Sequence, residues 1–333
     1  MARYYPNLLL LLMEMILIGC GGASHINGKK AVLQPDLRKE ILQEVEKKDI
    51  ARTMEFLSSD ALAGRPTGSE NIERAAAYII AELERAGIRP YFDTYRHSFE
   101  VKGLTGHNVV GYLEGTDPEL KDEVILIGAH YDHIGTGEEV GGDGIANGAN
   151  DNASGTTAVL EIATFLSTTD LRRSVILALF SAEEMGLVGS TELAKDLARS
   201  FGENGQELYL MFNIEMIGAP MRDKDYQVYL TGYDRSNLAE KFNSYSEEQV
   251  VGFLPQAEEY NLFRRSDNYP FFEEFQVPAH TVSSFDFTNY SYYHHVDDEF
   301  ENIDVTHMER VIEALLPGVI AMANSENPEI VLR

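Results

Sequence analysis

Residues 124–135 read Val-Ile-Leu-Ile-Gly-Ala-His-Tyr-Asp-His-Ile-Gly, an apolar run that leads into a histidine and an aspartate. Short apolar runs of this kind are typical of strands buried on both faces of a sheet. Residues 148–155 then read Gly-Ala-Asn-Asp-Asn-Ala-Ser-Gly, a glycine-flanked turn that presents Asp151 at the start of a predicted helix. Ligands of open α/β sheets bind at the carboxyl ends of strands, so the two segments together predict a metal-binding turn.

The rest of the chain alternates predicted strands and helices, identified by the spacing of apolar residues. Helices are expected over residues 36–58, 70–86, 152–166, 187–199, 237–246 and 305–323, with a loop and short helix over 262–275. Strands are expected over residues 92–101, 108–113, 123–128, 174–180, 207–214, 227–231 and 279–283. This order predicts an α/β fold: one three-layer domain with a central mixed β-sheet flanked by helices.

Composition limits the kinds of partner. A hydrophobic content of 44% over 333 residues is enough for the core of one large domain. The formal net charge of −27 argues against nucleic acid or an anionic membrane surface as an electrostatic partner. We therefore expect no nucleic-acid binding.

The amino-terminal segment has the pattern of a targeting signal. Arg3 precedes an apolar run over residues 8–18 that only Glu14 interrupts, and the run is too short for a transmembrane span. Residues 17–20, Leu-Ile-Gly-Cys, resemble a bacterial lipobox. We expect a lipoprotein signal peptide over 1–19, lipidation at Cys20, a flexible tether over 20–35 and a folded domain over 36–333. The alternative is an ordinary signal peptide with an incidental cysteine.

Cys20 is the only cysteine, so the mature protein has no internal disulfide. Gly21 after this cysteine resembles the sorting pattern for the outer membrane. The sequence therefore predicts a protein of the bacterial cell envelope that is lipid-anchored to the outer membrane, on a face that the pattern leaves open.

Further carboxylates and imidazoles follow the predicted strands. Residues 181–190 read Ser-Ala-Glu-Glu-Met-Gly-Leu-Val-Gly-Ser, and residues 215–218 read Glu-Met-Ile-Gly. Near the end, residues 266–271 read Ser-Asp-Asn-Tyr-Pro-Phe and residues 293–298 read Tyr-His-His-Val-Asp-Asp. Histidine and carboxylate side chains at equivalent strand ends are the donors that zinc prefers in catalytic sites.

In this order, with their glycines, the segments resemble metallopeptidase family M28, the di-zinc aminopeptidases. The resemblance covers roughly residues 50–325 and includes residues 57–65, which read Leu-Ser-Ser-Asp-Ala-Leu-Ala-Gly-Arg. A single His-x-Asp or Glu-Glu pair would be a weak signal, whereas the ordered set is specific. The resemblance implies a zinc-exopeptidase-like fold and an M28-like peptidase domain over residues 36–333.

The resemblance implies a set of metal ligands for two zinc ions per chain. Asp151 corresponds to the residue that bridges both ions. His130 and Glu215 would complete one site, and Glu184 and His294 the other. Glu215 departs from the family, which usually has aspartate at this position.

The resemblance also implies roles around the metals. Glu183 corresponds to the catalytic carboxylate, and Asp132 to the aspartate that accepts the second imidazole N–H of His130. The peptide bond after the bridging residue, Asp151–Asn152, is typically cis in the family. Asn268 stands where histidine is frequent, so we assign it no catalytic role.

The sequence leaves the roles of several residues open. The spacing from His294 to Asp298 matches the family's pattern, so the resemblance favours His294 over His295 as the ligand. His107 and His133 are interpreted as structural or exposed. Three residues of the loop before Ser266 are candidates for lining a substrate pocket, the alternative being an ordinary surface loop: Tyr260, Arg264 and Arg265.

Together these features predict a metal-dependent exopeptidase, and most directly an aminopeptidase that hydrolyses the N-terminal bond of a peptide substrate. Two metal ions activate water in such enzymes, and a glutamate acts as general base. A carboxylate-rich site of this kind would also accept cobalt or manganese. Two alternatives remain: a glutaminyl-cyclase-like transferase with a single zinc, and a catalytically inactive binding protein on the same fold.

Overall fold

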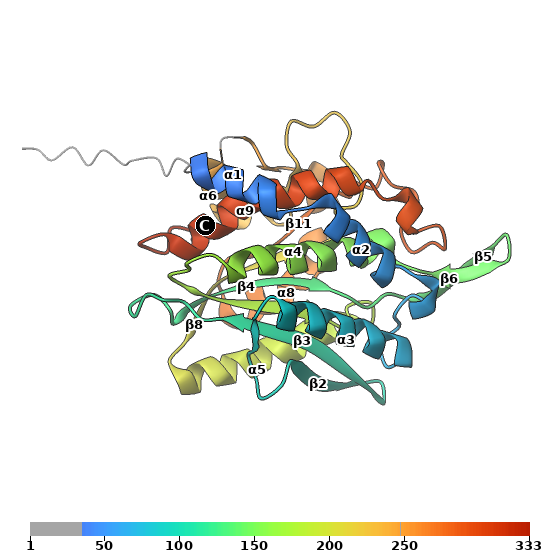
Figure 1. Cartoon of the computed structure of the whole chain (residues 1–333), viewed down its shortest axis with the longest axis horizontal. Helices are drawn as coiled ribbons and strands as arrows, with labels where there is room; N and C mark the ends of the chain where they lie inside the picture. Colours follow the sequence, from blue (N-terminus) through green and yellow to red (C-terminus); the bar gives the residue numbers. More distant parts are fainter. Residues whose placement is uncertain (1–34, 247) are drawn as a thin grey trace, which may run out of the picture. The chain divides into compact units, whose positions relative to one another are not determined.

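In the computed structural model, which describes residues 35–246 and 248–333, a nine-stranded mixed sheet lies between layers of helices (Figure 1). Its order is β1-β3-β7-β4-β8-β11-β9-β10, with β2 paired to β3. The strands are β1 (Arg89–Pro90), β2 (Arg96–Val101), β3 (Leu104–Leu113), β4 (Glu123–His130), β7 (Ser174–Phe180), β8 (Glu207–Ile214), β9 (Val228–Leu230), β10 (Val251–Gly252) and β11 (Ala279–Ser283). The four central strands β7, β4, β8 and β11 run parallel, whereas β3 and β9 run antiparallel to their central neighbours.

The central strands are apolar on both faces. On β4, Val124 and Leu126 belong to one hydrophobic core, while Ile125 and Ile127 belong to the other. All four side chains are fully buried. Successive side chains of a strand point to opposite faces, so a continuous apolar run can be buried only where helices cover both sides of the sheet.

Helices cover both faces, as the predicted α/β fold requires. The first core includes side chains of α1 (Pro35–Glu44), α2 (Lys47–Leu57), α3 (Glu70–Arg85), α4 (Gly155–Ser167), α6 (Leu238–Tyr245) and α9 (Val305–Asn324). The second core lies on the opposite face and includes side chains of α5 (Val188–Asn204) and α8 (Asn268–Phe275). Figure 1 shows α2, α4 and α9 on one side of the sheet and α5 on the other.

One predicted helix is two. The helix expected over residues 36–58 is interrupted at Glu46, where the backbone is extended (φ −116°, ψ 124°), and α2 begins at the next residue. Both α1 and α2 pack against α9. Both helices therefore need apolar residues on the side that faces α9. The apolar spacing continues across the interruption for this reason, so the spacing does not reveal that the helix is broken.

A hairpin was not predicted at all. Strands β5 (Gly135–Val140) and β6 (Asp143–Ala146) form a separate two-stranded sheet that projects from the body in Figure 1. Most of its strand residues are glycine or polar and few are buried, so no apolar alternation marks it in the sequence. The hairpin follows directly on the segment that carries His133. The short β10 and α7 (Pro255–Glu259) were also not predicted.

The described residues include no helix that is long and apolar enough to cross a membrane. The predicted signal peptide over 1–19 and the lipidation site at Cys20 lie outside the described residues. So does the predicted tether over 20–35, apart from Pro35, where α1 begins.

Candidate metal centre

The candidate site lies at one edge of the sheet because three neighbouring strands end there. β4 is parallel to both β7 and β8, so their carboxyl ends meet at this edge. His130 is the last residue of β4, the Glu183–Glu184 pair follows β7, and Glu215 directly follows β8. Asp151 lies in the turn at Ala149–Ser154, which leads into α4.

One set of donors consists of His130, Asp151 and Glu215. Each offers a nitrogen or oxygen atom, and these atoms lie within 4.8 Å of one another. The His130 Nε2 atom is 3.3 Å from Oδ1 of Asp151. His130 is fully buried, so its ring cannot turn to water for a partner.

A second set consists of His133, Asp151, Glu184 and His294. His294 Nε2 lies 3.3 Å from Oδ2 of Asp151 and 3.2 Å from Oε2 of Glu184. Asp151 therefore turns one carboxylate oxygen, Oδ1, to the first set and the other, Oδ2, to the second. A carboxylate shared in this way is suited to bridge two cations.

The donor sets fit zinc by a direct observation. Three buried atoms that point into the two sets have no hydrogen bond of acceptable geometry: His130 Nε2, Glu184 Oε1 and Glu215 Oε2. Buried polar groups are normally paired, and an unpaired one costs about 1–3 kcal/mol. Imidazole nitrogens and carboxylate oxygens gathered without partners are what a zinc ion would satisfy.

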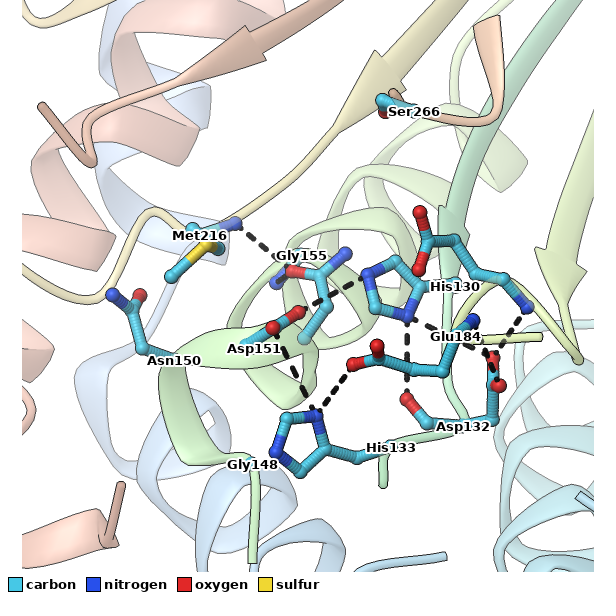
Figure 2. Close-up of polar contacts among 12 residues, drawn as sticks. His130, Asp132, His133, Gly148, Asn150, Asp151, Gly155, Glu184, Met216 and Ser266 are labelled. Carbon is cyan, nitrogen blue, oxygen red and sulfur yellow. Dashed lines mark hydrogen bonds and ion pairs between the residues drawn. The ribbon is translucent and has the colours of Figure 1, made fainter. Parts of the chain in front are cut away.

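His133, whose position in the sequence suggested a structural or exposed residue, lies in the cluster. Its side chain is fully buried, and Nδ1 lies 2.9 Å from Oε1 of Glu184 and 3.8 Å from Oδ2 of Asp151 (Figure 2). Gly148 makes room for the ring, since a Cβ atom there would lie 2.5 Å from it. The signal available in the sequence was the short spacing after His130, just beyond the end of the strand.

Asp132 supports several groups at once. Nδ1 of His130 is 3.2 Å from the main-chain oxygen of Asp132 and 3.7 Å from its carboxylate, so the main chain is the nearer acceptor. The carboxylate accepts hydrogen bonds from the main-chain N–H groups of Glu183 (3.2 Å) and Glu184 (3.4 Å), and from the hydroxyl of Thr67. Asp132 thus fixes the segment that carries both glutamates as well as the ring of His130.

Asp298 holds the main chain of the turn that carries Asp151. The Asp298 carboxylate accepts hydrogen bonds from the main-chain N–H groups of Asn150 (2.7 Å) and Asp151 (3.1 Å). The hydroxyl of Tyr290 donates to the same carboxylate. The peptide bond Asp151–Asn152 is cis, as the family resemblance implies.

Arg65 ties the surrounding loops together. Its fully buried guanidinium donates to the main-chain oxygens of Tyr131 (2.8 Å), Asn147 (2.6 Å) and Gly148 (3.0 Å), and also to that of Leu57. Burial lowers the pKa of this group to about 10, which leaves it charged at neutral pH. The Gly-Arg pair stood within the family resemblance, but its sequence gave no sign of four carbonyl partners.

Glu183 lies beside the donor sets without belonging to either. No hydrogen bond to its carboxylate is found among residues 35–246 and 248–333. Burial raises the pKa of Glu183 well above its usual value, with opposition from His130 and reinforcement from Glu215. An unengaged carboxylate next to a metal-binding cluster is positioned to accept a proton.

The structure separates the neighbouring histidines. His294 faces Asp151 and Glu184, whereas His295 Nδ1 accepts a hydrogen bond from the main chain of Asp297. Burial lowers the pKa of His294, but hydrogen bonds with the two carboxylates outweigh it and raise the value to about 10. His107 lies away from the cluster, with Nδ1 3.0 Å from the hydroxyl of Ser98.

A small cavity adjoins Glu215. Of the three pocket candidates in the loop before Ser266, Arg265 lines this cavity. Tyr260 stacks edge-on against Phe287 at 5.0 Å, and the guanidinium of Arg264 lies 5.2 Å from the ring centre of Tyr269.

Comparison with known proteins identifies relatives of this chain by sequence and by fold. The sequence model of peptidase family M28 matches residues 108–319. Leupeptin-inactivating enzyme 1 of Streptomyces exfoliatus is 30% identical over 210 residues, which cover 62% of this chain and 42% of that enzyme. The chain thus spans less than half the length of the first curated relatives it matches.

Solved structures share the fold. A zinc aminopeptidase from Bacillus subtilis matches with a TM-score of 0.65 at 15% identity, over 85% of this chain and 96% of that one. A glutaminyl cyclase from Porphyromonas gingivalis matches with a TM-score of 0.62 at 16% identity, over 82% and 97%. Likeness at this level of identity shows the fold alone, and it does not choose between the two activities.

Proposed function

The chain belongs to peptidase family M28, and from this premise we propose that it is a zinc-dependent aminopeptidase that removes the N-terminal residue of peptides. The observation that carries the proposal is the carboxylate of Asp151, whose two oxygens face two different sets of metal donors. A site for two metal ions with a separate glutamate beside it suits the hydrolysis of an amide bond.

Two groups of residues would hold the metals. His130 and Glu215 would bind one zinc ion, Glu184 and His294 the other, and Asp151 both. We assign His133 a supporting role, because its Nδ1 lies 2.9 Å from the carboxylate of Glu184. When bound, two zinc ions lower the pKa of a water molecule and polarise the carbonyl group of the scissile bond.

Glu183 would act as the general base and then as the general acid. Its carboxylate has no hydrogen-bond partner among the described residues, and the main-chain bond to Asp132 holds it beside the cluster. Glu183 takes a proton from the attacking water and returns it to the nitrogen of the departing amine. The products are a free amino acid and a peptide shortened by one residue.

The charge of the site favours a substrate with a free α-ammonium group. Five carboxylates lie at or beside the two donor sets: Asp132, Asp151, Glu183, Glu184 and Glu215. Ionised, they carry more negative charge than two divalent ions neutralise. A positively charged amino terminus is attracted to such a site, whereas a peptide carboxylate is repelled unless a separate cation receives it.

The same geometry bears on two other functions. A glutaminyl-cyclase-like transferase needs a single zinc, and one of the two donor sets would then hold no metal. A binding protein that has lost its activity would also have lost donors, but each ligand position here carries an imidazole or a carboxylate. The cyclase predicts one zinc per chain, and the binding protein predicts no turnover.

One preparation of the purified protein tests the proposal. Its zinc content is measured, and its activity is assayed on aminoacyl substrates, on carboxyl-terminal peptide substrates and on a peptide with amino-terminal glutamine. We expect release of the amino-terminal residue, loss of activity on chelation and recovery with zinc. Ring closure of the glutamine peptide with one zinc per chain would instead establish the cyclase function.

We also propose a lipid anchor at Cys20, which would place the enzyme in the bacterial cell envelope at the outer membrane. The support is the lipobox-like sequence before this single cysteine. Cys20→Ser should move the protein from the membrane fraction to the soluble fraction without changing its specific activity. A Cys20→Ser protein that stays in the membrane fraction would contradict the anchor.

A further inference from the structure

The cavity next to Glu215 is small. It has a volume of about 50 Å³ and lies between β9, β11, the loop before α8 and the ring of Tyr293. One water molecule needs roughly 10–15 Å³ measured in this way, so the cavity takes about four water-sized groups. Side chains of the length of aspartate, glutamate, glutamine or leucine match this size. Size alone therefore does not decide which of them binds.

The cavity wall offers a hydroxyl hydrogen with no acceptor. Two threonine hydroxyls line the wall, and one of them is already used as a donor. The hydroxyl of Thr281 donates its hydrogen to Oδ1 of Asn268 (2.8 Å), because an amide oxygen has no hydrogen and can only accept. The oxygen of Thr231 accepts the main-chain N–H of Thr281 (3.1 Å), but no acceptor for its own hydrogen is found within the described ranges. Thr231 is 3% exposed and lines the cavity. The wall thus holds a spare hydrogen-bond donor.

Arg265 adds a positive charge to the same wall. Its side chain is exposed and makes no hydrogen bond or ion pair with the rest of the described chain. Other exposed basic residues also lack such partners, Lys102, Arg222 and Lys224 among them, but Arg265 differs from these three because it lines the cavity. The preceding residue is different, since Arg264 rests on the ring of Tyr269 and does not line the cavity.

We propose that Arg265 binds a carboxylate of the substrate at this cavity, with Thr231 as a further donor. The inference rests on the proposed aminopeptidase function and specifies its substrate class. Two sources of the carboxylate are compatible with the site: the side chain of an amino-terminal aspartate or glutamate, and the carboxyl terminus of a dipeptide. Glu215 also borders the cavity, but a metal ion bound to it would offset its charge.

Other substrate classes satisfy the cavity less well. A leucine side chain fits by size but leaves the guanidinium of Arg265 and the hydroxyl of Thr231 without partners. Lysine and arginine side chains are too long for the volume, and they carry the same charge as Arg265. Hydrogen bonds to a charged group contribute about 1.5–3 kcal/mol each, which corresponds to roughly a 10- to 100-fold preference.

The test compares pairs of substrates that differ only in the carboxylate. kcat/KM is measured for the p-nitroanilides of glutamate, glutamine and leucine, and for Ala-Ala against Ala-Ala amide. If the carboxylate is a side chain, glutamate exceeds glutamine by about 10-fold or more. If it is the carboxyl terminus, Ala-Ala exceeds its amide by a similar factor.

Two variants identify the residue. Arg265→Gln should remove the preference for the carboxylate substrate and leave kcat/KM for the neutral substrates within about twofold. Arg264→Gln, the matched control, should keep the preference. Equal hydrolysis within each pair, or an equal loss on all substrates in Arg265→Gln, overturns this inference while the aminopeptidase function stands. No hydrolysis of any substrate contradicts the proposed function itself, and the inference falls with it.

Discussion

Asp151 is the buried residue that both donor sets share. Its carboxylate is almost fully buried, and each oxygen faces a different histidine, His130 on one side and His294 on the other. Such a carboxylate is stable only if its charge is compensated. Asp298 is itself acidic and therefore does not compensate the charge of Asp151. It accepts hydrogen bonds from the main chain of the turn, and these hold the Asp151 carboxylate so that it points into the cluster.

Glu183→Gln tests the proton-transfer role at the level of one atom. The amide has the same shape as the carboxylate but cannot accept the proton of water, so turnover should fall by a factor on the order of 10²–10⁴. Zinc content should stay at the wild-type value, because Glu183 belongs to neither donor set. Glu203→Gln, an exposed position on α5, serves as the control. Near wild-type turnover in Glu183→Gln would show that another group acts as the base.

His133→Ala tests the supporting role of the imidazole. Removing the contact with Glu184 should weaken zinc binding at the second donor set by about 10- to 100-fold, the usual effect of losing a partner of a metal ligand. Competition with a chelator of known affinity measures the change. His107→Ala should leave the affinity unaltered, since His107 lies away from the cluster. Equal zinc affinity in the two variants would show that His133 does not support the metal site.

The sequence was informative at residues that end a strand or come shortly after it. His130, Glu183, Glu184 and Glu215 lie at the edge expected, because the ends of parallel strands are set by the apolar pattern. His133 was missed since it lies in an irregular segment, where direction depends on packing against Gly148. The partners of Arg65 were missed for the same reason, as main-chain oxygens carry no sequence signal.

At the level of elements, α4 carries a titratable group that does not belong to the site. Burial raises the pKa of Glu161 to about 7 from an ordinary value of 4.5, with a smaller contribution from Asp49 and opposition from Arg52. The folded protein therefore holds more protons than the unfolded chain between about pH 4.5 and 7. Folding stability contributed by this group is present below that range and is lost as pH rises through it.

Glu161→Gln should remove this loss. At pH 8 the variant should be more stable than wild type by roughly 1–3 kcal/mol, with little difference near pH 4.5. Denaturant unfolding at both pH values measures the change, with Glu55→Gln, exposed on α2, as the control. An identical pH dependence in wild type and Glu161→Gln would show that the group is not perturbed in the folded protein.

Prediction of the elements succeeded where burial imposes a pattern. The bounds of β7, β8 and β11 agree with the expected strands, since these strands are buried along nearly their whole length in the middle of the sheet, although β11 carries the polar residues His280, Thr281 and Ser283. The hairpin of β5 and β6 was missed because most of its strand residues are glycine or polar and few are buried. The break between α1 and α2 was missed because both helices bury residues against the same α9.

For the whole molecule, the central claim is that two zinc ions share Asp151. The excess of acidic residues makes the protein a good host for cations, so metal content must be compared with a variant rather than read alone. The control is Glu203→Gln, which removes a carboxylate far from both donor sets.

The most direct measurement is zinc bound per chain, determined by elemental analysis after dialysis, for wild type, Glu203→Gln and Asp151→Ala. We expect two zinc ions in wild type and in Glu203→Gln, and less than one in Asp151→Ala, because both sites lose the shared carboxylate. One zinc in wild type, or two in Asp151→Ala, would contradict this expectation.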